Sequence, residues 1–164
     1  MTQHHLWNKA KSVKIQTSSE IAEGFSLGFD KKIPEAVKNA LIDFVYWAED
    51  SFSFPVTLWV DFKYNHYLMD QAGNRVGYRF YWADWKPYPV IENPDDIPVI
   101  ELPVRLEHSA IDEILFSFIE AISHYYAWLT NSLTEDFQPD ETQTAEVLYT
   151  YLNETNQEVP YGDF

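Results

Sequence analysis

The sequence predicts one α+β domain in which helices pack on one side of a small antiparallel sheet. Three observations lead to this prediction. The chain has 164 residues, close to the commonest size of a single domain, and 46% of them are apolar. Two segments alternate apolar and polar residues at the strand period, and three others repeat apolar residues at the helix period. We therefore assign residues 1–164 to one domain and expect residues 1–10 to be loose.

The first predicted helix spans residues 34–50, and the first predicted strand spans residues 56–62. Pro34 suits the first turn of a helix, where the missing N–H has no intrahelical partner. The apolar residues of this helix recur at helical spacing: Val37, Leu41, Phe44, Val45 and Ala48. In the strand, the apolar residues fall on one face: Val56, Leu58, Val60 and Phe62.

A second alternating run follows a turn. Residues 70–74 contain Asp, Gly and Asn, which are turn residues, and residues 76–82 alternate again. The two alternating runs predict a long hairpin. Residues 98–105 predict a further short strand, and their prolines place it at a sheet edge, where a missing N–H is tolerated. Another strand is expected to begin at Val13 and Ile15.

Two helices are predicted at the end of the chain, over residues 110–130 and 139–154. The first has one apolar stripe: Ile111, Ile114, Leu115, Phe118, Ile122, Tyr125 and Leu129. The second has Pro139 near its start and is expected to bury four residues: Ala145, Leu148, Tyr149 and Leu152. No Lys or Arg lies between Glu113 and Asn131, so we expect the first of these helices to be covered on both sides or to line a cleft.

The composition excludes several classes of function. The net charge is −15, from 26 acidic and 11 basic residues, so no basic surface is available to bind nucleic acid. The chain has no cysteine, which excludes disulfides and thiolate metal sites. It has no apolar segment typical of a signal peptide and no run near the roughly 20 apolar residues of a membrane-spanning helix. We expect a cytoplasmic protein without membrane contact.

Glu120 and His124 are the residues that indicate chemistry. They lie four positions apart, on the side of helix 110–130 opposite its apolar stripe. A carboxylate and an imidazole in a covered position need partners. Three alternatives are open: they form a structural hydrogen-bonded pair, they form part of a metal site, or they do neither.

Residues 118–128, Phe-Ile-Glu-Ala-Ile-Ser-His-Tyr-Tyr-Ala-Trp, resemble the active-site helix of small zincin-type metallopeptidases, in particular gluzincin-like and SprT-like domains. In that family a His-Glu-x-x-His motif is often followed by aromatic residues. An alignment without gaps places His124 at the second histidine, Glu120 at the first, and Ala121 at the general-base glutamate. Glu141, 17 residues beyond His124, falls roughly where such enzymes place a carboxylate ligand. The resemblance extends over residues 33–154 in layout but only over about ten residues in motif.

The resemblance implies a metal set of Glu120, His124 and Glu141, which would hold zinc or another divalent ion. It implies no catalytic residue, because Ala121 cannot accept a proton from a metal-bound water. We therefore expect a metallopeptidase-like domain without ordinary peptidase activity, whose cleft binds a peptide or protein. The predicted edge strand at residues 98–105 would suit an extended peptide added by strand pairing.

Two alternatives remain open. One is an active metal-dependent hydrolase with a Glu-x-x-x-His…Glu site. The other is a metal-free acidic interaction protein, such as an inhibitor of a basic protein. Glu141 also has a structural explanation, because acidic residues are favoured near helix starts. Packing explains the aromatic run of Tyr125, Tyr126 and Trp128 more simply than a substrate platform does.

Overall fold

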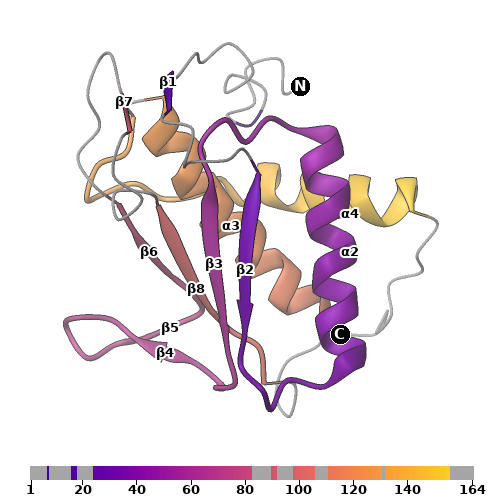
Figure 1. The fold of residues 1–164 in the computed structure, drawn as a ribbon. Coiled ribbons are helices and arrows are strands. Elements are labelled where there is room, and N and C mark those ends of the chain that lie inside the picture. The colour runs from indigo at the N-terminus through magenta and orange to yellow at the C-terminus, as the bar shows by residue number, and fades with distance from the viewer. Residues whose placement is uncertain are drawn as a thin grey trace.

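The computed structural model describes residues 7, 16–17, 24–82, 90–91, 98–105, 111–130 and 132–155. The fold is α+β, with a mixed sheet and helices packed against it (Figure 1). The helices are α2 (Glu35–Ser51), α3 (Ile111–Leu129) and α4 (Glu141–Glu154). The main sheet contains β2 (Phe25–Phe29), β3 (Leu58–Lys63), β6 (Arg79–Tyr81) and β8 (Val99–Pro103).

The strands of the main sheet follow the order β2-β3-β8-β6. β2, β3 and β8 are parallel, and only β6 is antiparallel to its neighbour. The predicted antiparallel sheet and long hairpin are therefore wrong, because β8 lies between β3 and β6. The alternation of apolar residues fixes which face of a strand is buried but not which strand lies beside it. β2 and β3 are parallel because α2 connects them as a crossover.

The edge position predicted for residues 98–105 is also wrong, since β8 is an inner strand. Its prolines lie at the ends of the strand, where they interrupt the ladder least. Pro98 precedes β8 and accepts a hydrogen bond from the Trp59 backbone, and Pro103 occupies the last paired position. β2, which the sequence did not predict, is an edge strand instead. Another short strand, β1 (Gln16–Thr17), pairs in parallel with β7 (Val90–Ile91); the strand start expected at residues 13–15 lies outside the described residues.

The turn predicted at residues 70–74 is confirmed, but it closes a smaller hairpin. β4 (Leu68–Met69) and β5 (Arg75–Val76) pair antiparallel on either side of it. The Asp70 N–H donates to the Asn74 carbonyl at 2.9 Å, and Gly73 has a φ of 84°, which favours glycine. The run predicted at residues 76–82 breaks after β5 and resumes in β6.

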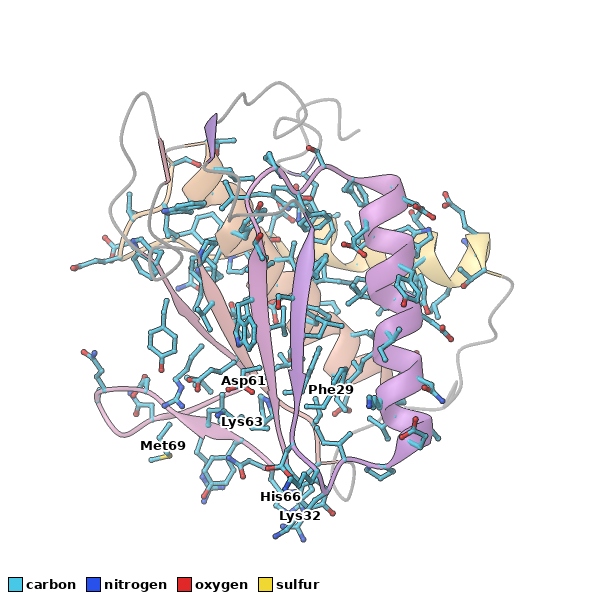
Figure 2. The ribbon with its side chains drawn as sticks, viewed as in Figure 1. Phe29, Lys32, Asp61, Lys63, His66 and Met69 are labelled. Atoms are coloured by element: carbon cyan, nitrogen blue, oxygen red, sulfur yellow. The ribbon has the colours of Figure 1, made fainter. Side chains whose placement is uncertain are left out.

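The helices cover one face of the sheet, as predicted. In β3, the side chains of Leu58, Val60 and Phe62 are buried toward α3, whereas Asp61 and Lys63 lie on the other face. Figure 1 shows α3 passing behind the sheet and α2 running beside β2. On the open face, Lys63 forms an ion pair with Asp61 at 2.8 Å (Figure 2). Within the described residues, this second face is the more polar one.

One hydrophobic core connects all three helices with the sheet. Phe118 of α3 lies at its centre and contacts the rings of Phe25, Phe44 and Phe62, with centroids 5.4–6.0 Å apart. Trp7, inside the segment expected to be loose, is fully buried, and its indole N–H donates to the Ser123 hydroxyl at 3.1 Å. The other residues of segment 1–10 are outside the described part of the chain.

The predicted helices are confirmed to within one or two residues at most ends. The buried set of α2 is the predicted one, and α3 is covered almost all round, also as predicted. The inward face of α4 differs: Tyr149 is 58% exposed, whereas Tyr151 is buried against α2. None of the helices in the described segments is long and apolar enough to cross a membrane.

Candidate functional site

The site is built where α3 passes behind β6. His124 of α3 is half-buried, and its Nε2 lies 3.0 Å from the hydroxyl of Tyr78, the residue just before β6. Which of the two atoms donates depends on the imidazole tautomer. The imidazole ring also contacts Phe80 of β6 and Phe137 of the loop after α3, at centroid distances of 5.8 and 4.9 Å. Counting only the part of the chain that the structure describes, His124 is therefore enclosed by aromatic rings and has one polar contact, with Tyr78.

A cleft of about 790 Å³ opens beside this histidine. Three segments line it: the hairpin β4–β5, the whole run of residues 76–82, and the loop that follows α3. The residues that line the cleft include a group of aromatic ones: Tyr78, Phe80, Tyr81, Trp82 and Phe137. Its volume is in the range of pockets that bind small molecules or a few residues of a peptide.

Burial controls the charge of the His124–Tyr78 pair. Burial lowers the pKa of His124 from 6.5 to about 4, so the imidazole is neutral near pH 7. Burial, together with the nearby charge of Glu120, raises the pKa of Tyr78 far above its usual value. Both side chains are thus uncharged at neutral pH.

Glu120 lies one helical turn before His124 and is also half-buried. Burial raises the pKa of its carboxyl group, and the charge of Glu141 raises it further. The structure therefore brings Glu141, the first residue of α4, near Glu120, although the Glu141 side chain itself is exposed. All three residues predicted from sequence are in one neighbourhood, together with Tyr78.

The arrangement is not that of a closed metal centre. Within the segments that the structure describes, no three His, Asp or Glu side chains are gathered closely enough to hold a metal ion. The Nε2 atom of His124, one of its two possible ligand atoms, is occupied by Tyr78. The charge of Glu141 disfavours the ionised form of the Glu120 carboxyl group. These residues provide donor atoms suited to a divalent ion, but not gathered around one point.

Ala121, aligned with the general base of the zincin-type motif, is fully buried in the hydrophobic core. This position of α3 faces the core, where an ionised carboxylate would be strongly destabilised. No proton acceptor thus stands at that position.

The aromatic run after His124 packs in the core, as predicted. Tyr125 and Tyr126 are fully buried, and Trp128 is nearly so. The Tyr125 hydroxyl accepts from the Val56 N–H at 3.1 Å, and the Tyr126 hydroxyl donates to the Ser53 carbonyl at 2.8 Å. These hydroxyls fix the chain that leads into β3, so the run is structural.

Tyr78 and Phe137 were not predicted as site residues. The alternation at residues 76–82 places Tyr78 and Phe80 on one strand face, which is the signal available in the sequence. That signal does not say which helix the face meets. Phe137 lies in an irregular loop and has no periodic signal at all.

We compared the chain with models of protein families, with characterised proteins and with solved structures, and nothing matches. The fold and the cleft therefore carry the functional conclusion by themselves.

Proposed function

We propose that the chain is a metallopeptidase-like domain that does not hydrolyse peptides and instead binds an extended peptide or protein segment in the cleft beside β6. The observation that carries this proposal is the position of the cleft along the outer edge of the sheet. Every residue from Val76 to Trp82 lines the cleft. All three residues of β6 are among them, and because their side chains alternate between the two faces of the sheet, the cleft lies along the edge of this strand.

The edge of β6 is suited to strand addition. Within the described strands, β6 pairs with β8 on one side and has no strand partner on the other. Unpaired backbone N–H and C=O groups on such an edge can pair with an extended peptide, while pockets receive alternate side chains. The aromatic lining provides those pockets. This role belongs to β6 and not to residues 98–105, whose strand is internal.

The element order supports the metallopeptidase-like assignment over residues 33–154. A helix, a hairpin and sheet strands precede the motif helix α3, and α4 follows it with Glu141 near Glu120. The environment of the motif argues against hydrolysis, because Ala121 is in the core and His124 contacts Tyr78. A scaffold of this kind without a base can still bind a peptide.

A scan of N-methylated peptides tests strand addition. A pool of extended peptides of about eight residues is screened for binding, and the best binder is then methylated at one backbone nitrogen at a time. A strand uses every second N–H toward its neighbour, so affinity should fall at alternate positions. Equal tolerance of methylation at all positions would contradict binding along β6. Failure of the whole pool to bind would contradict the proposed function.

Metal content tests the alternative of a metal-dependent hydrolase, which the closeness of Glu141 to Glu120 favours. Untagged protein is soaked with zinc or manganese, dialysed and analysed, with His124→Ala as the test variant. His66→Ala, in the loop between β3 and β4 (Figure 2), is the matched control. We expect no stoichiometric metal and no cleavage of a peptide pool. Metal and cleavage lost only in His124→Ala would establish the hydrolase instead.

A further inference from the structure

The charged groups that line the cleft leave an excess of negative charge. Among the described residues they are Asp70 and Glu135, opposed by Arg79. Arg79 is already neutralised: its guanidinium forms an ion pair with Glu101 at 2.8 Å and donates to the Met69 carbonyl at 2.8 Å. In the described part of the chain, neither cleft carboxylate has a basic partner.

The surroundings of the cleft are also negatively charged. Glu120 lies near Tyr78, and Glu141 lies near Glu120. The whole chain has a net charge of −15. An approaching cation is therefore attracted both at long range and inside the cleft.

The aromatic lining adds a second attraction for cations. Trp82 is 44% exposed in the cleft, and its ring stacks on Phe80 at a centroid distance of 5.6 Å. The face of an indole ring attracts ammonium and guanidinium groups. The neighbouring Tyr81 ring already has Arg79 near it, at 5.9 Å. The inner wall at Phe80 and Phe137 is apolar and suits an uncharged side chain.

We propose that the cleft selects a basic peptide, an extended segment that carries Lys or Arg residues together with apolar residues. This proposal rests on the proposed function, since it names the class of peptide that pairs with β6. The apolar side chains enter between Phe80 and Phe137. The basic side chains lie toward Asp70, Glu135 and the exposed ring of Trp82.

Three peptides of one sequence test this selection. They share their apolar residues and carry Lys, Gln or Glu at the other positions. At low salt we expect the Lys peptide to bind about tenfold more tightly than the Gln peptide, and the Glu peptide to bind most weakly. The preference should largely vanish at about 1 M salt, where charges are screened beyond about 3 Å. Equal binding of the Lys and Gln peptides would overturn the basic-peptide proposal and leave the proposed function intact. If none binds, both fail.

Two double variants locate the attraction. Asp70→Asn with Glu135→Gln removes both cleft charges, and the asparagine keeps the side-chain oxygen that accepts from the Asn74 N–H. Asp43→Asn with Glu146→Gln makes the same charge change on exposed positions of α2 and α4. We expect the ratio of the affinities for the Lys and Gln peptides to fall at least about threefold in the cleft variant and to stay unchanged in the control variant. Equal losses in both would overturn the proposal, because the attraction would then belong to the whole acidic surface.

Discussion

Acidification should destabilise the protein through His124. The folded protein has a pKa of about 4 at this residue, because the ring is buried among Tyr78, Phe80 and Phe137, whereas the unfolded chain has a value near 6.5. Between these values the unfolded chain binds a proton that the folded protein does not. The contribution of His124 to the free energy of unfolding is therefore fully present above about pH 6.5. It declines as the pH falls and reaches its lowest value below about pH 4.

The expected loss follows from the pKa difference. Each unit of difference corresponds to about 1.4 kcal/mol, so the free energy of unfolding falls by about 2 kcal/mol from about pH 7.5 to about pH 5, and by about 3 kcal/mol in total. Denaturant unfolding of the wild type and of His124→Gln at both pH values isolates this contribution, because other titrating groups are common to both proteins. The wild type should lose about 2 kcal/mol more than the variant.

The same reasoning has an independent test. The imidazole signals of His124, assigned by comparison with His124→Gln, should titrate near pH 4 in the folded protein. Titration near the ordinary value of 6.5 would refute the burial argument. A pH dependence of unfolding identical in wild type and variant would refute it as well.

Three further perturbations have defined outcomes. Phe118→Ala should lower the free energy of unfolding by about 3–5 kcal/mol in chemical denaturation, because it empties the centre of an aromatic core; a loss below about 1 kcal/mol would contradict that packing. Trp7→Phe should lower the free energy of unfolding by about 1 kcal/mol. A double-mutant cycle with Ser123→Ala should give a coupling energy that accounts for most of this loss; a coupling energy of zero would mean that the hydrogen bond does not contribute to stability. Glu120→Gln should raise the free energy of unfolding near pH 7, because burial and the charge of Glu141 disfavour the ionised carboxyl group. The difference from the wild type should disappear on acidification, and a variant that is less stable than the wild type near pH 7 would contradict this.

Much of the site was predictable, because it depends on local spacing. Residues four positions apart on a helix share a face, so Glu120 and His124 were expected together, and α3 was expected to be covered on both sides. Tyr125 belonged to the predicted apolar stripe, and the packing of Tyr126 was expected from its place in the aromatic run. The partner of His124 was not predictable. Tyr78 is 46 residues away, and only the docking of β6 on α3 brings its hydroxyl to Nε2.

The sequence by itself determined the elements whose signal is periodic. The 3.6-residue repeat determined α2 and α3, and the two-residue repeat determined the buried face of β3. Strand neighbours have no comparable signal, since a pleated strand offers the same hydrogen-bonding groups to any partner. The insertion of β8 between β3 and β6 was therefore decided by tertiary packing. That same packing left β6 outermost among the described strands and placed the cleft beside it, because the outer position of a strand is set only by the order of the whole sheet.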